Sequence, residues 1–297
     1  MTTASAHPAR NETLTGIFLM VVAISLFPAS DALSKYLVGT YDALQVVWIR
    51  YIVQFTAVLI ALAPRSRWHL MRTRRPGLQA LRGFFTVLST LAFVAALGYV
   101  PLVDAVTLLF SSSLMLVALS VPFLGERVGI HRWSAVIIGF LGVLVVMRPG
   151  MGVLHWAATG ALVSAFSNAI YQIATRALSV TDRAITTFFY VNVAGVVLLG
   201  PTMFFVWIPM TLDAWIWVIA AGLLSGAGHY LMIRSFDHAG ASVLAPFNYV
   251  QIVSATLIGY FWFAELPDFW TVVGLIIVVG SGLYILRREQ RAARAAS

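Results

Sequence analysis

The sequence contains no cysteine among its 297 residues, and charged residues make up only 10% of the chain. The missing cysteine excludes disulfide bonds, thiolate zinc sites, iron–sulfur clusters and thiol catalysis. The scarcity of charge, together with 60% hydrophobic residues and a mean hydropathy of +0.90, excludes a soluble globular domain. The composition therefore predicts a polytopic membrane protein.

Common catalytic and metal-binding patterns are also missing. The chain has no GxxxxGK[ST] phosphate loop, no HExxH motif and no pair of histidines at metal-ligand spacing. We therefore expect no enzyme activity, no cofactor and no metal site. The net charge of +8 is compatible with nucleic-acid binding, but the arginines lie between apolar runs rather than on one amphipathic face. We expect a small-molecule substrate and the lipid bilayer as partners, no nucleic acid, and a monomer or weak dimer.

Apolar runs near the length of about 20 residues that a membrane helix needs recur along the whole chain. Turn and charge signals divide them into ten candidate spans, at residues 14–38, 42–63, 77–98, 102–123, 132–148, 155–176, 184–206, 212–235, 241–263 and 269–287. The predicted fold is an all-α polytopic membrane protein with ten transmembrane helices. Residues 1–13 and 289–297 are expected to form tails.

The arginines are distributed unevenly over the connections. Fifteen of them fall in the termini and one set of alternate connections, whereas the opposite set holds only Arg148. Cytoplasmic loops are enriched in lysine and arginine. Both termini are therefore predicted to be cytoplasmic.

The two halves of the chain share a spacing pattern that indicates a duplication. Each of two glutamates is followed by small residues at the ninth and sixteenth positions: Ala135 and Gly142 after Glu126, and Gly274 and Ser281 after Glu265. The predicted repeats are residues 14–150 and 151–288, with five helices each. An odd number of helices inserts the second repeat upside down relative to the first, as in many transporters.

Polar side chains inside the spans indicate a cavity, because lipid cannot satisfy their hydrogen bonds. We expect the substrate-binding residues among Asn248, Gln251, His229, Ser111, Ser113, Asn168, Tyr171 and Gln172. Pro246 has a structural role here, because it lacks a backbone donor and frees a carbonyl within the ninth span. The two amides and His229 are equally compatible with helix packing, and His229 is also a candidate proton-coupling group. The spans 132–148 and 269–287 carry almost nothing polar and are expected at the periphery.

Three charged residues in the first two spans are candidates for gating or charge pairing. Asp31 and Lys35 stand four residues apart, a spacing at which they can neutralise each other or act in recognition. Arg50 lies deep in its span and requires either a protein partner or an anionic substrate.

The other charges near span ends are expected to have structural roles. Arg82 is predicted to extend its side chain to the cytoplasmic interface. Glu126 and Glu265 are each predicted to cap the amides of the helix that follows.

Several of these residues also carry a family resemblance. Leu124-Gly-Glu126-Arg127 precedes a segment with Trp133, Gly139, Gly142 and Val143, and Ala264-Glu265 precedes one with Gly274 and Gly280. Together with Val47-Trp-Ile-Arg50, these motifs resemble those of EamA-type transporters of the drug/metabolite transporter superfamily. The resemblance implies two inverted five-helix repeats and secondary transport of small metabolites across a bacterial inner membrane. The second copy departs from the pattern, with Glu265-Leu-Pro267 where the first has Glu126-Arg127.

The expected function is therefore a secondary transporter that works by alternating access through a central cavity. The chain is similar to aromatic amino acid exporters of this family, which makes amino acid export the main hypothesis. Uptake or exchange of another metabolite, such as S-adenosylmethionine or a drug, is the alternative within transport. A non-transporting membrane receptor or scaffold is the alternative from another class.

Overall fold

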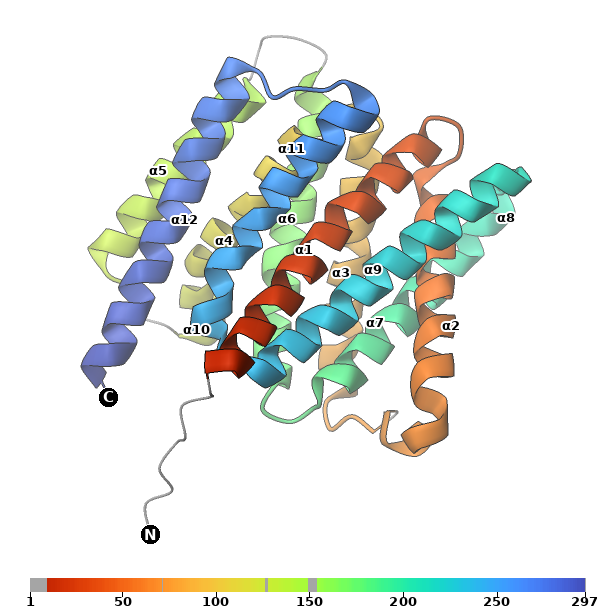
Figure 1. Cartoon of the computed structure of the whole chain (residues 1–297), viewed down its shortest axis with the longest axis horizontal. Helices are drawn as coiled ribbons and strands as arrows, with labels where there is room; N and C mark the ends of the chain where they lie inside the picture. Colours follow the sequence, from red (N-terminus) through yellow and green to blue (C-terminus); the bar gives the residue numbers. More distant parts are fainter. Residues whose placement is uncertain (1–9, 71, 126–127, 149–153, 297) are drawn as a thin grey trace.

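The computed structural model describes residues 10–70, 72–125, 128–148 and 154–296, and every regular element within those ranges is helical (Figure 1). The elements are α1 (Arg10–Val38), α2 (Ala43–Leu70), α3 (Pro76–Leu97), α4 (Leu102–Leu124), α5 (Ile130–Met147), α6 (Leu154–Leu178), α7 (Ala184–Leu199), η1 (Gly200–Thr202), α8 (Met203–Val206), α9 (Leu212–His238), α10 (Ala241–Leu244), η2 (Ala245–Tyr249), α11 (Val250–Phe263) and α12 (Phe269–Ala296). They form ten spans, because α7, η1 and α8 follow one path and α10, η2 and α11 follow another. The predicted fold class is confirmed.

Two spans are interrupted at prolines. Pro201 lies in η1, where α7 gives way to a 3-10 turn, and Pro246 lies in η2, between α10 and α11. Proline cannot donate the backbone hydrogen bond that would continue an α-helix. Eight helical stretches of the described residues, the path through α7, η1 and α8 among them, are long and apolar enough to cross a membrane, and α6 and the ninth span complete the ten.

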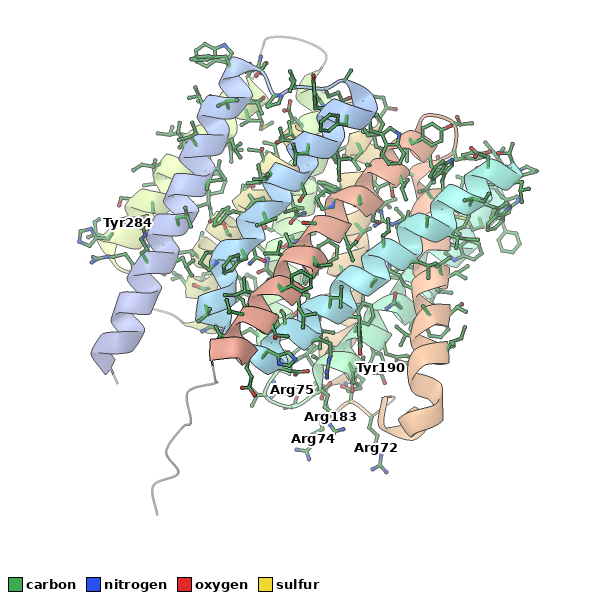
Figure 2. All side chains as sticks on the ribbon, viewed as in Figure 1. Arg72, Arg74, Arg75, Arg183, Tyr190 and Tyr284 are labelled. Carbon is green, nitrogen blue, oxygen red and sulfur yellow. The ribbon has the colours of Figure 1, made fainter. Side chains whose placement is uncertain are left out.

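The bundle has two chemically different ends. Figure 2 shows Arg72, Arg74, Arg75 and Arg183 together at one end, which we call the basic end; the other is the distal end. Helix α1 begins at the basic end, whereas α6 begins at the distal end (Figure 1). The two five-helix halves therefore run in opposite senses, as the odd helix count predicts.

The small residues behind the repeat pattern form one helix contact. Helices α5 and α12 pack side by side at the edge of the bundle (Figure 1), as predicted for the two least polar spans. A Cβ atom on Gly142 would lie 2.8 Å from Ile277 and 3.0 Å from the backbone oxygen of Gly274, so only glycine allows this approach. The small residues that follow each glutamate at the same spacing therefore allow α5 and α12, one from each half, to pack closely.

Candidate functional site

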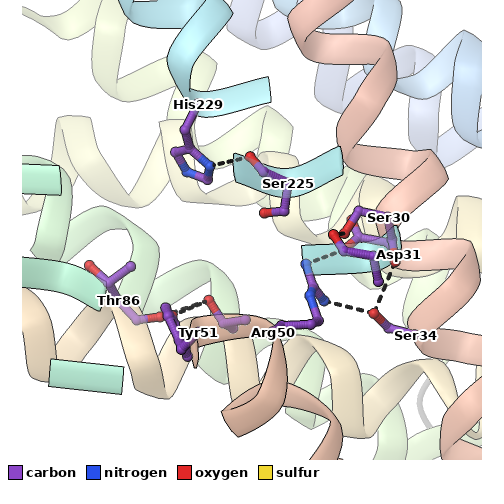
Figure 3. Close-up of polar contacts among 10 residues, drawn as sticks. Ser30, Asp31, Ser34, Arg50, Tyr51, Thr86, Ser225 and His229 are labelled. Atoms are coloured by element: carbon purple, nitrogen blue, oxygen red, sulfur yellow. Dashed lines mark hydrogen bonds and ion pairs between the residues drawn. The ribbon is translucent and has the colours of Figure 1, made fainter. Parts of the chain in front are cut away.

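A buried ion pair joins α1 to α2 in the distal half of the bundle (Figure 3). Arg50 Nη2 lies 3.6 Å from Asp31 Oδ1, and Arg50 Nη1 donates a 2.8 Å hydrogen bond to Ser34 Oγ. Ser34 in turn donates to the backbone oxygen of Ser30, and Ser30 Oγ donates to Ala221 O of α9 at 2.8 Å. The pair therefore belongs to a hydrogen-bonded chain that connects both halves of the protein.

Arg50 is not fully satisfied in this arrangement. Its side chain is only 6% exposed, and its Nε is buried without a hydrogen-bond partner among the described residues. A buried arginine usually uses its planar fork for two-point contacts with a carboxylate. The separation of 3.6 Å from Asp31 is longer than such a contact, so the pair keeps unused hydrogen-bonding capacity.

Lys35 pairs with Glu265 rather than with Asp31, which corrects the predicted four-residue pair. Lys35 Nζ lies 2.6 and 2.8 Å from the two carboxylate oxygens of Glu265 and donates a further bond to Val100 O at 2.9 Å. Asp31 and Lys35 lie on one helix but meet different neighbours, because α2 approaches Asp31 while the start of α4 and the end of α11 meet near Lys35.

Glu265 also caps a helix, but not the one that follows it. Its Oε2 accepts a 3.2 Å bond from Leu102 N at the start of α4. The following helix, α12, is capped by Asp268, whose Oδ1 accepts from Thr271 N at 2.8 Å. Slight burial acts to raise the pKa of Asp268, but its bonds with Arg148 and Thr271 hold that pKa below the ordinary value. The predicted counterpart, Glu126, lies outside the described residues.

His229 of α9 sits between two aromatic rings near the middle of its helix. The ring centroid of Phe27 lies 4.8 Å away in an edge-on arrangement, and that of Phe188 lies 5.2 Å away and nearly parallel. His229 Nδ1 donates to the backbone oxygen of Ser225 at 2.9 Å. In the neutral ring this leaves Nε2 as an acceptor. Three helices, α1, α7 and α9, thus contribute a ring to one cluster.

The predicted amides of α6 contact one another. Gln172 donates to the Asn168 side-chain oxygen, and Asn168 Nδ2 donates to Tyr171 OH at 3.4 Å. Their spacing of three and four residues places them on one side of the helix, and this side lies against α3, where Arg82 donates to Thr175 at 2.6 Å. These residues lie in the basic half of the bundle.

The predicted residues of the ninth span have a different environment. Asn248 of η2 and Gln251 of α11 are half-buried, and neither side chain forms a hydrogen bond within the described part of the chain. The neighbouring Ser254 donates to Ser25 Oγ at 3.1 Å, which fixes α11 against α1. The two amides therefore keep free donors and acceptors beside the break at Pro246.

The serines of α4 are satisfied locally. Ser111 donates to Leu108 O at 2.6 Å, and Ser113 donates to Phe110 O at 2.8 Å, both within their own helix. Each hydroxyl keeps acceptor capacity. Phe110 stacks on Tyr249 of η2 at 5.3 Å, so this face of α4 lies against the broken span.

A polar stripe on α3 is the main feature that the sequence analysis missed. Gln79, Arg82, Thr86 and Ser89 recur at intervals of three and four residues, the spacing of one helical face. Arg82 does not extend to the interface as predicted; it bonds to α6 and α7 instead. The periodicity was visible in the sequence and could have indicated an inward-facing stripe.

Comparison with known proteins decides the family. The sequence profile of the EamA-like transporter family matches residues 14–148 and again residues 155–287. This chain belongs to the EamA-like transporter family. Like the rest of that family, it is a membrane transporter and not an enzyme.

Relatives of this EamA transporter resemble it along nearly their whole length. An S-adenosylmethionine uptake transporter of Rickettsia bellii is 25% identical over 277 residues, covering 93% of this chain and 95% of the relative. A pseudopaline exporter of Pseudomonas aeruginosa is 27% identical over 280 residues, covering 93% and 97%. A riboflavin transporter of Vibrio cholerae is 25% identical over 293 residues, covering 96% and 97%. A crystal structure at 18% identity, with a TM-score of 0.61 over 95% of this chain and 98% of the other, shares the fold.

The relatives carry chemically different molecules in both directions. The family therefore establishes small-molecule transport, while the substrate of this EamA transporter has to be argued from its own residues. Within the described part of the chain, no group of three or more histidine, aspartate or glutamate side chains could hold a metal ion.

Proposed function

We propose that this EamA transporter exports amino acids, including aromatic ones, by alternating access through the centre of the bundle. The observation that carries this proposal is the buried Asp31–Arg50 pair, in which Arg50 Nε has no hydrogen-bond partner among the described residues. An α-amino acid bears one ammonium and one carboxylate, both attached to its α-carbon. It can therefore insert between the two side chains, its ammonium toward Asp31 and its carboxylate toward Arg50.

When a zwitterion replaces the contact between Asp31 and Arg50, neither buried charge is left without a counter-ion. Removing one partner of a buried ion pair costs about 3–5 kcal/mol, because the remaining charge has no counter-ion. A zwitterion supplies both missing partners at once. A purely cationic or purely anionic ligand supplies only one, so the pair favours substrates with both charges.

The surrounding side chains suit a substrate with an apolar or aromatic group. Phe27, Phe188 and His229 present ring surfaces in one cluster. Binding sites of this kind are mostly apolar with a few polar anchors. As further anchors we propose the residues predicted from sequence, namely Asn248, Gln251, Ser111, Ser113, Asn168, Tyr171 and Gln172.

We further propose that the basic end faces the cytoplasm of a bacterium and that the protein lies in the inner membrane. The arginine bias between the two ends supports this orientation, and the relatives named above are bacterial. The proposed repeat boundaries are residues 14–150 and 151–288, and the proposed transport unit is a monomer or weak dimer.

The test is counterflow of radiolabelled tryptophan, phenylalanine and methionine into liposomes that contain the purified protein, with and without a pH gradient. Asn248→Ala and Gln251→Ala should each lower the initial rate at least several-fold while insertion is unchanged. Thr256→Ala is the matched control, because Thr256 lies in the same span and donates to a carbonyl of its own helix, Ile252 O. Wild-type rates in both amide variants would refute their placement.

A second candidate is uptake of S-adenosylmethionine, which the Rickettsia relatives favour through their names and near-complete coverage. This molecule carries the same zwitterionic end together with a purine ring and a sulfonium. Including it in the counterflow panel separates the two candidates, since exchange of S-adenosylmethionine without exchange of tryptophan or phenylalanine would replace the main proposal. A rate that rises with the pH gradient would assign proton coupling, and equal rates would assign facilitated diffusion.

A further inference from the structure

Arg82 is a cation inside the bundle without a carboxylate partner among the described residues. Lys35 and Arg50, which also point into the bundle, each have a carboxylate oxygen within 4.0 Å. Arg82 has neutral partners instead: Nε donates to Thr175 Oγ1 at 2.6 Å and Nη1 donates to Thr187 O at 3.1 Å. Three of its five N–H donors remain without a protein partner in these residues.

The Arg82 side chain points into the bundle and not toward lipid. Its partners lie on α6 and α7, and its guanidinium lies 5.7 Å from the centre of the Tyr171 ring. It is also close enough to Tyr51 of α2 and His229 of α9 to interact with them electrostatically. The lipid-facing side of α3 carries other residues, since Leu81 and Phe84 are 45% and 48% exposed.

The groups around Arg82 are suited to an anion. The amides of Asn168 and Gln172 and the hydroxyl of Tyr171 follow one another along α6, on the side that meets Arg82. Arginine combined with neutral donors is a common way to recognise a carboxylate. No described carboxylate lies within 4.0 Å of Arg82: Asp31 pairs with Arg50 in the distal half, and Asp182 accepts from Thr73 and Gln79.

We propose that Arg82, with Tyr171 and Asn168, forms a second anion-binding site in the basic half that takes the carboxylate of the transported molecule. The inference rests on the proposed function, because the zwitterion bound at the Asp31–Arg50 site is the molecule whose carboxylate Arg82 binds on the path between that site and the basic end. Each half of the bundle then holds one inward-pointing arginine, but among the described residues only the distal one has a carboxylate partner.

The test compares three indole ligands on purified protein in detergent. Tryptophan carries both charges, indole-3-propionate carries only the carboxylate, and tryptamine carries only the ammonium. Arg82→Gln should weaken binding of indole-3-propionate by about 10-fold to 100-fold, the range expected for a lost charge-assisted hydrogen bond. Binding of tryptophan should weaken by a smaller factor, because tryptophan keeps the Asp31–Arg50 site. Tryptamine binding should change less than about threefold, because it has no group for Arg82. Arg82→Lys should be intermediate, since lysine keeps the charge without the fork.

Arg183→Gln is the matched control, because Arg183 is exposed at the basic end (Figure 2). The melting temperature of each variant without ligand reports folding separately. Equal losses for all three ligands in Arg82→Gln would show a purely structural arginine and overturn the site. A change that appears only in nanodiscs containing phosphatidylglycerol would reassign Arg82 to a lipid headgroup and would also overturn it.

Failure of the proposed function is recognisable separately. If the wild-type protein exchanges no amino acid in liposomes, but benzoate raises its melting temperature and Arg82→Gln abolishes that rise, the anion site stands and the amino acid proposal fails. If neither benzoate nor indole-3-propionate affects the wild-type protein, the anion site itself is refuted.

Discussion

The Lys35–Glu265 pair provides the sharpest prediction about stability and gating. It closes a ring of contacts at the distal end, in which Glu265 accepts from Lys35 and from Leu102 N while Lys35 also donates to Val100 O. These contacts hold α1 of the first half, the start of α4 and the end of α11 of the second half together. Under the proposed alternating access, these contacts must break whenever the distal end opens.

The stability that the Lys35–Glu265 pair contributes depends on how far its two side chains are buried. Lys35 and Glu265 side chains are 12% and 27% exposed, so the pair lies between a surface pair worth about 0–1 kcal/mol and a buried pair whose disruption costs about 3–5 kcal/mol. We expect Lys35→Met and Glu265→Gln each to lower stability by about 1–3 kcal/mol. The double variant should lose less than the sum, with a coupling energy of about 1–2 kcal/mol.

Two assays check this prediction. Melting temperatures in detergent give the double-mutant cycle. Since the chain has no cysteine, a single Val103→Cys probe on the buried side of α4 reports opening through its labelling by a membrane-impermeant thiol reagent. Losing the coupling energy of about 1–2 kcal/mol raises the open population by about 5-fold to 30-fold, so Glu265→Gln should accelerate labelling by that factor. Additive single effects together with unchanged labelling would refute the reasoning.

Two further predictions concern single sites. A Cβ atom on Gly195 would overlap the ring of Tyr51, so Gly195→Ala should lower stability by about 1–3 kcal/mol, and adding Tyr51→Leu should restore much of the melting temperature. At the basic end, slight burial acts to raise the pKa of Asp182, but hydrogen bonds from Thr73 and Gln79 hold it below 3.8. A carboxylate whose pKa is lower in the folded than in the unfolded state stabilises the fold at pH values above its unfolded pKa. This stabilisation is lost as the pH falls through the folded-state pKa. Asp182→Asn should therefore lower the melting temperature at pH 7 and lose its effect in strong acid; a constant difference would contradict this.

The fold could be predicted because it depends on properties that are local in sequence. Span length and hydropathy determined the ten crossings, and the odd number of helices per repeat determined the inversion. The spacing that links Gly142 to Gly274 was also visible, although its meaning as a contact between α5 and α12 required the packed helices. Pro246 was expected to free a carbonyl in the ninth span and lies in a 3-10 turn, whereas the similar break at Pro201 was not predicted.

The charge pairing could be predicted only in part, because it depends on which helices meet. Asp31 and Lys35 looked like mutual partners at four residues apart, yet Lys35 finds Glu265 at a sequence separation of 230 residues. Arg50 was expected to need a partner and has one. The prediction for Arg82 used only its distance from the helix end. Its position within the periodic polar stripe of α3 would have indicated that its side chain points into the bundle.

The five residues of η2 give the ninth span a property that a continuous helix lacks. A 3-10 helix rises about 2.0 Å per residue with three residues per turn, against about 1.5 Å and 3.6 in an α-helix. Converting five residues from one form to the other would therefore change the length of the span by about 2.5 Å and rotate everything beyond it by about 100°. Gln251 lies beyond that segment, so a change of winding within η2 turns its amide from one neighbouring helix toward the next.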